Sequence, residues 1–180
     1  MGPRLDDELL NALVGAVGSA AARTAVATIA WILPVELEVS RVGLCWYEPD
    51  ADLAIVTAVW SKHPTSATVG VSHPAHGAMF ESFGAVLHGK TAGIRLFGDH
   101  EGVPHVLEDL LIEEGNASAV QIPLMEEDRV LAVLTIFSAS RDAFLRTDLA
   151  FFDRVGEALS ATLIPLAHTA ADAIRSAQAP

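Results

Sequence analysis

Apolar residues along the first part of the chain are spaced as in helices. From Leu5 to Val17 they recur every three or four positions, which predicts an amphipathic helix. From Ala20 to Leu33 the chain is apolar nearly all round, which is typical of a helix that is buried or packed on a partner. Pro34 is expected to end this second helix, because the residue before a proline disfavours helical backbone.

The spacing then becomes that of strands. The segments Val39–Tyr47 and Leu53–Trp60 are rich in β-branched and aromatic residues, and the turn EPDAD separates them. They therefore predict an antiparallel hairpin. The segments Ala117–Leu124 and Val130–Ser138, separated by the acidic turn MEEDR, predict a second hairpin. A short extended piece is expected over Thr91–Leu96.

Helices are expected between the hairpins and at the end of the chain. Ser72 can serve as an N-cap, so a helix is predicted over Pro74–Leu87, where a proline in the first turn costs little. A shorter helix is predicted over Pro104–Glu114. A long helix is predicted from Thr147, and Pro165 is expected to interrupt it. The whole order predicts an α/β (α+β) domain with helices on both faces of one antiparallel sheet.

Composition and charge exclude two classes of function. The uncharged runs are shorter than the ~20 residues that a membrane span needs, and the start MGPRLDDELL lacks the order of a signal peptide. With Cys45 as the single cysteine, a reducing, cytoplasmic location is expected. The net charge is −12 and the 11 basic residues are scattered, so direct nucleic-acid binding is not expected.

Four segments in this order resemble the GAF domain family. RVGLCWYEPDADLAIV is similar to the opening hairpin of the family, and SHPAHGAMFESFGAVLHGKTAGI to the helix and short strand over its binding cavity. EEGNASAVQIPLMEEDRVLAVLTIFS resembles its second hairpin, and RDAFLRTDLAFFDRVGEALSATL its closing helix. Residues 1–180 are thus expected to be a single GAF-like domain with its core at about 20–163.

The resemblance implies a specific layout and role. It implies a central antiparallel sheet of about five or six strands, with N- and C-terminal helices on one face and shorter helices or loops over the other. It further implies a non-catalytic sensory or regulatory domain that binds a small molecule in a cavity over the sheet and acts in signal transduction, a two-component system or transcription regulation. A homodimer through the terminal helices is expected, with a kinase, cyclase or DNA-binding output elsewhere. The alternative is a dimerisation or protein-interaction module without a ligand.

Candidate ligand-pocket residues lie on the strands and on the segment that the resemblance places over the sheet. Gln121 and Thr135 are polar residues within otherwise apolar strands, and buried polar groups require partners. A mostly apolar pocket with a few polar contacts is the usual form of a small-molecule site. The complete candidate set is Tyr47, Trp60, His73, His76, Phe80, Phe83, His105, Gln121 and Thr135.

No metal or other cofactor is expected. His73 and His76 have a spacing that places two imidazoles on one helix face, but a metal site needs further ligands. A haem- or metal-binding sensor therefore stays a remote alternative. Among relatives of the family, bilin attachment uses a cysteine near a histidine, and methionine sulfoxide reduction uses cysteine pairs. Cys45 is alone and in a strand, so an enzyme is not expected.

Overall fold

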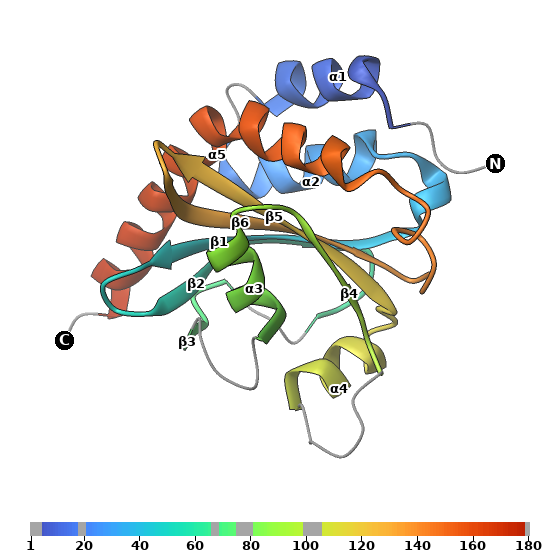
Figure 1. Ribbon diagram of the computed structural model, residues 1–180. Coiled ribbons are helices and arrows are strands. Elements are labelled where there is room, and N and C mark those ends of the chain that lie inside the picture. The colour runs from blue at the N-terminus through green and yellow to red at the C-terminus, as the bar shows by residue number, and fades with distance from the viewer. Residues whose placement is uncertain (1–4, 18–20, 66–68, 75–80, 99–105, 179–180) are drawn as a thin grey trace.

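The computed structural model describes residues 5–17, 21–65, 69–74, 81–98 and 106–178. It consists of helices packed on both faces of one antiparallel sheet (Figure 1). The strands are β1 (Val39–Glu48), β2 (Leu53–Ser61), β3 (Ser72–Pro74), β4 (Gly93–Leu96), β5 (Ser118–Glu126) and β6 (Arg129–Ser138). Their spatial order is β3-β2-β1-β6-β5-β4. The predicted α/β fold and both predicted hairpins are therefore confirmed.

The terminal helices cover one face of the sheet. They are α1 (Asp7–Val17), α2 (Ala22–Ile32) and α5 (Leu149–Gln178), with a short 3₁₀ turn, η1 (Val35–Leu37), before β1. Helices α2 and α5 lie on the strands, and α1 lies across both of them as an outer layer (Figure 1). The largest fully buried side chains of this core include Phe144, Phe151, Phe152, Ile29, Leu44, Leu134 and Leu159.

Helix α5 approaches strand β5 closely at Gly156. A Cβ added there would lie 2.6 Å from the carbonyl oxygen of Pro123 and 2.9 Å from Cγ2 of Ile122. One turn later, the Ser160 hydroxyl accepts a hydrogen bond from the Met125 N–H at 2.9 Å and donates one to the Gly156 carbonyl. Glycine followed by serine at one-turn spacing thus lets the helix rest directly on the strand backbone.

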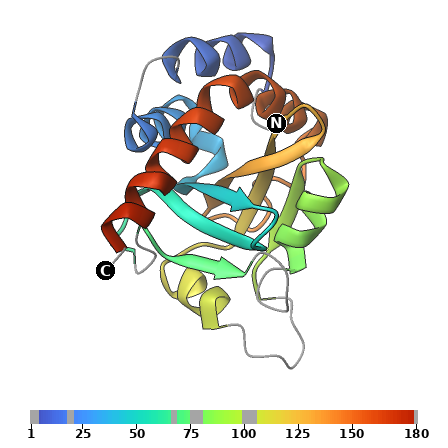
Figure 2. The ribbon, with the colours of Figure 1, turned by 90° about the vertical axis from the view of Figure 1, so that its left-hand side faces the viewer.

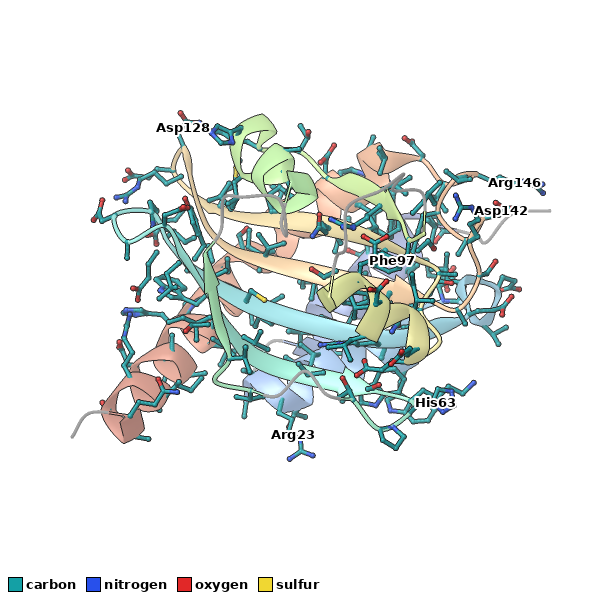
Figure 3. All side chains as sticks on the ribbon, turned by 90° about the horizontal axis from the view of Figure 1, so that it is seen from below. Arg23, His63, Phe97, Asp128, Asp142 and Arg146 are labelled. Carbon is teal, nitrogen blue, oxygen red and sulfur yellow. The ribbon has the colours of Figure 1, made fainter. Side chains whose placement is uncertain are left out.

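Two shorter helices cover the opposite face of the sheet. They are α3 (Glu81–Gly89) and α4 (Val106–Glu113), and Figure 3 views this face with both helices in front of the strands. The second helix is anchored near its start by Glu108, which accepts hydrogen bonds from the Arg95 guanidinium at 2.5 Å and from the Gly98 N–H at 2.7 Å. Beyond its end, the Ser40 hydroxyl donates a hydrogen bond to the Asn116 side chain at 2.7 Å.

Two predicted local features are wrong, and both involve proline. Ser72–Pro74 is an edge strand paired with Leu53–Ile55, not the start of a helix. An edge strand tolerates Pro74 because the missing N–H removes no bond inside the sheet. Pro165 does not interrupt the last helix, which is continuous over Leu149–Gln178. Pro165 is exposed, as is Ala161, so the carbonyl that loses its helical partner lies on the solvent side.

No described helix combines the length and the hydropathy that a membrane span requires.

Candidate functional site

The sheet face under α3 and α4 carries a row of residues that are in register across five strands. Gly93 pairs with Gln121, Gln121 with Thr135, Thr135 with Gly43, and Gly43 with Val59. Their neighbours along each strand face the terminal helices and belong to the main core. Because side chains alternate along a strand, the five residues of this row point to the α3–α4 side.

Two polar residues of the row are buried and make no side-chain hydrogen bond within the described part of the chain. Gln121 is 9% exposed and Thr135 is 7% exposed. Neither side chain has a hydrogen-bond partner among the described residues. Between them and β2, Gly43 contributes no side chain, and among the described residues only Cε2 of Phe137, at 4.0 Å, would contact a Cβ added there. The amide and the hydroxyl therefore share one sheet face with a position that lacks a side chain, where a bound molecule or water can supply their hydrogen bonds.

Arg41 is a buried cation at one end of this face. Its guanidinium carbon lies 5.1 Å from the centre of the Phe137 ring, and its Nη1 donates to Oε2 of Glu114 at 3.2 Å. The two charged side chains are 6% and 13% exposed. The Nε of Arg41 is buried and has no hydrogen-bond partner in the part of the chain that the structure describes. Desolvation lowers the pKa of Arg41, while the Glu114 carboxylate raises it.

Cys45 and Tyr47 follow Gly43 along β1 on the same face. Burial raises the pKa of the Cys45 thiol to about 11, and the Arg41 charge opposes this shift. The thiol is therefore protonated at neutral pH, which makes it a weak nucleophile. Tyr47 is 8% exposed and packs with Leu87 of α3 and with Val133. Burial raises the pKa of Tyr47 as well, and the Asp52 carboxylate adds to the rise.

The structure brings together only part of the predicted pocket. Tyr47, Gln121 and Thr135 share the α3–α4 face. Trp60 is a correction, because it lies on the other face and packs edge-on against Trp31 of α2, with ring centres 6.1 Å apart. A β-bulge causes this: Thr57 has no partner in the register between Val56 and Ala58, so the side chains beyond it change face.

The remaining predicted pocket residues cannot be placed on this face. The positions of His76, Phe80 and His105 lie outside the described residues. The backbones of His73 and Phe83 are in β3 and α3, respectively, but their side chains are not described. No group of three or more potential metal ligands occurs among the described side chains.

Sequence reasoning missed Arg41 and Gly43. The segment VSRVGLCWY contains the signal: a charged residue and a glycine interrupt a run of apolar residues, both at positions that alternate onto one face. A charge within a buried strand needs a partner, and a glycine within a strand marks a close approach or an open space. Both residues were therefore candidates on physical grounds.

Comparison with known proteins identifies relatives of this fold. The GAF domain family matches residues 19–163. A free methionine-R-sulfoxide reductase from Neisseria meningitidis, solved with its substrate, is 18% identical at a TM-score of 0.62, covering 91% of this chain and 90% of that one. A GAF domain of an Acinetobacter phosphoenolpyruvate-protein phosphotransferase is 16% identical at 0.62, covering 90% and 93%. A GAF domain of a two-component sensor histidine kinase from Bacillus halodurans is 16% identical at 0.54, covering 73% and 85%. No curated protein matches the sequence.

These neighbours contradict the prediction that the chain is not an enzyme. That prediction rests on Cys45 being the single cysteine, which leaves no cysteine pair for reductase chemistry within one chain. The Neisseria protein has the same fold and is a reductase, whereas the other two neighbours are domains of regulatory and phosphotransfer proteins. One scaffold thus carries both enzymes and regulatory domains, so a catalytic role is compatible with this fold.

Proposed function

Because the chain belongs to the GAF domain family, we propose that it is a sensory or regulatory domain that binds a small molecule on the α3–α4 face of its sheet. The observation that carries the proposal is the pair Gln121 and Thr135, buried residues whose polar side chains make no hydrogen bond among the described residues and lie in one row with Gly43. Unpaired buried polar groups are costly, and a ligand supplies the missing partners.

Helix α5 offers a route by which ligand binding can change the structure at a distance from the site. Its C-terminal half crosses the sheet to the side of β2 and β3 (Figure 2). There Arg175 forms an ion pair with Glu48 at the end of β1, and the His168 ring lies 4.7 Å from the Trp46 ring. Since β1 also carries Gly43, a shift of this strand on ligand binding is expected to move the end of α5.

A thermal-shift screen tests small-molecule binding. The probes are nucleotides, amino acids, small aromatic compounds and small anions, added singly to the wild-type protein and to the variant Gly43→Val. A ligand that binds only the folded state raises the free energy of unfolding by mass action, by about 2.7 kcal/mol at a hundredfold excess over Kd. The melting temperature rises accordingly. We expect at least one class of compound to raise the melting temperature of the wild type. In Gly43→Val the valine side chain should occupy the ligand position and abolish this rise.

The matched control is Gly15→Val, on α1, where an added Cβ meets nothing within 4 Å. This variant should keep the full ligand-induced shift. If no class stabilises the wild type, the interaction module without a ligand is the better description of the domain. If the shift survives in Gly43→Val, the ligand binds away from this row of the sheet.

We further propose a homodimer through the terminal helices. The apolar side of α2 no longer supports it, because Ala25, Val26 and Ile29 are buried within one chain. Support comes instead from two exposed apolar side chains near the end of α2, Trp31 at 78% and Val35 at 84% exposed. Light scattering is expected to give twice the monomer mass, and a shift to the monomer is expected for Trp31→Ser. A monomeric wild type at tens of micromolar would contradict the dimer.

We also propose that the domain is cytoplasmic and acts on a separate output unit. The single cysteine supports a reducing cytoplasm. The likeness to a sensor-kinase domain supports an output in a two-component system or in transcription regulation, with the kinase, cyclase or DNA-binding unit on another domain or protein.

A further inference from the structure

The Nε–H of Arg41 is a buried donor without a partner among the described residues. The Glu114 carboxylate accepts a hydrogen bond from Nη1 of the same guanidinium. In a guanidinium group, Nε–H and the neighbouring N–H on the same side are parallel, and this pair matches the two oxygens of a carboxylate. A buried donor left unpaired is costly, so an exogenous acceptor is expected at this edge.

The position of Arg41 connects it with the space at Gly43. The guanidinium lies over the Phe137 ring, and the edge of the same ring is the one described neighbour within 4 Å of the Cβ position at Gly43. The Arg41 charge also acts on the Cys45 thiol, which lies beyond Gly43 on β1. Arg41, the open position and the row with Thr135 and Gln121 therefore form one continuous surface.

We propose that Arg41 recognises a carboxylate group on the ligand of this site, while Thr135 and Gln121 hydrogen-bond a polar group further along the same molecule. This assignment rests on the proposed function and narrows it to small organic acids. The net charge of the chain is −12, so its overall electrostatic potential repels anions. Specificity for a carboxylate therefore comes from the single buried cation of Arg41.

Glu114 places a negative charge on the same guanidinium and therefore opposes the binding of an anionic ligand there. It pairs with Arg41, accepts a hydrogen bond from the Thr65 hydroxyl at 3.0 Å, and lines a hollow of ≈ 500 Å³ together with His63, Leu110 and Glu113. The hollow gives the Glu114 side chain room to move when a ligand carboxylate approaches. Since Glu114 follows directly on α4, binding of an acid is expected to loosen this end of the helix.

The test uses acetate as the smallest carboxylate and acetamide as its neutral isostere. The side-chain Nε–Hε signal of Arg41 is observed by NMR in the wild-type protein at constant ionic strength and is assigned with Arg41→Lys. We expect acetate to shift this signal saturably and acetamide to leave it in place. Removing the competing charge in Glu114→Gln is expected to raise the acetate affinity about tenfold. The control Arg23→Lys, at an exposed position on α2 (Figure 3), should bind acetate as the wild type does.

The outcomes separate this inference from the proposed function. If neutral compounds bind in the thermal-shift screen and lose binding in Gly43→Val, but acetate does not move the Arg41 signal, the proposed function stands and the carboxylate assignment is wrong. If acetate moves the signal equally in Gly43→Val, Arg41 binds anions outside the ligand surface, which also overturns the assignment. If neither the screen nor acetate gives binding, both proposals fail.

Discussion

Gly156→Val is expected to lower the free energy of unfolding by about 3 kcal/mol or more, because a side chain at this position collides with the backbone of β5. The added Cβ would lie 2.6 Å from the Pro123 carbonyl oxygen, a contact that a rotamer change cannot relieve. Helix α5 would have to move outward, breaking the hydrogen bond from the Met125 N–H to Ser160. In a chain of this size the loss corresponds to a decrease in melting temperature of roughly 6–12 °C.

The same substitution at Gly15 isolates the steric cause. Gly15 is also helical, but a Cβ there meets no atom within 4 Å. Because valine and glycine differ little in helix propensity, Gly15→Val should change stability by less than about 0.5 kcal/mol. Equal effects at the two positions, measured by thermal or denaturant unfolding, would show that α5 does not rest on β5 as described.

Glu114→Ala is the second substitution with a large expected effect. It leaves the guanidinium of Arg41 buried without its counterion, and removing one partner of a buried ion pair typically costs about 3–5 kcal/mol. The side chains of both partners are nearly covered, at 6% and 13% exposed. The pair is therefore only weakly screened by solvent, and we expect the lower end of this range in denaturant unfolding.

Two further variants check that the buried charge is the cause. The double variant Arg41→Met with Glu114→Ala removes the cation too, and it should be more stable than Glu114→Ala alone. Asp128→Ala breaks the surface pair with Lys90, in which the Asp128 side chain is 89% exposed, and should cost less than about 0.5 kcal/mol. A loss in Glu114→Ala no larger than in Asp128→Ala would contradict a buried, charge-dependent contact.

Local sequence pattern was sufficient for the hairpins because each hairpin is a short-range structure. Alternating apolar residues and a turn of suitable composition lie within about twenty residues of one another in both cases. The acidic segment between β5 and β6 illustrates this: Glu126 pairs with Arg129, and Glu127 adopts a positive φ of 54° at the turn. The order of helices and hairpins then restricts the architecture to few possibilities.

The predictions at the two prolines are wrong because the energetic cost of a proline depends on the residues that surround it. Pro74 resembles a residue of a first helical turn, yet the partner strand β2 makes it part of an edge strand. Pro165 resembles a helix breaker, yet the helix on both sides of it is held on the core by Leu163, Ile164 and Ala167. Packing of the flanking turns outweighs the loss of one solvent-exposed hydrogen bond.

In the candidate site, too, sequence pattern identified some residues correctly and misplaced others. The polarity of Gln121 and Thr135 within apolar strands was enough to select them. Trp60 was wrongly grouped with them because one unpaired residue, Thr57, reverses the facing of everything after it, and a bulge leaves no clear mark in this sequence. The expectation of a non-catalytic domain also exceeded what sequence pattern supports, since a shared fold does not specify the chemistry of a site.

The sequence by itself thus determined the two hairpins, the order of the main elements and the family, because these depend on local periodicity and on motif order. Only the tertiary structure decided which residues share the α3–α4 face and that Gly156 lets α5 touch β5. It also decided that Arg41 is buried against Glu114, with an Nε that has no partner among the described residues. These last properties arise from contacts between residues far apart in the chain, and burial and pairing are set by such contacts. The amide of Gln121 and the hydroxyl of Thr135, which the sequence indicated, share the α3–α4 face with Arg41, which it did not.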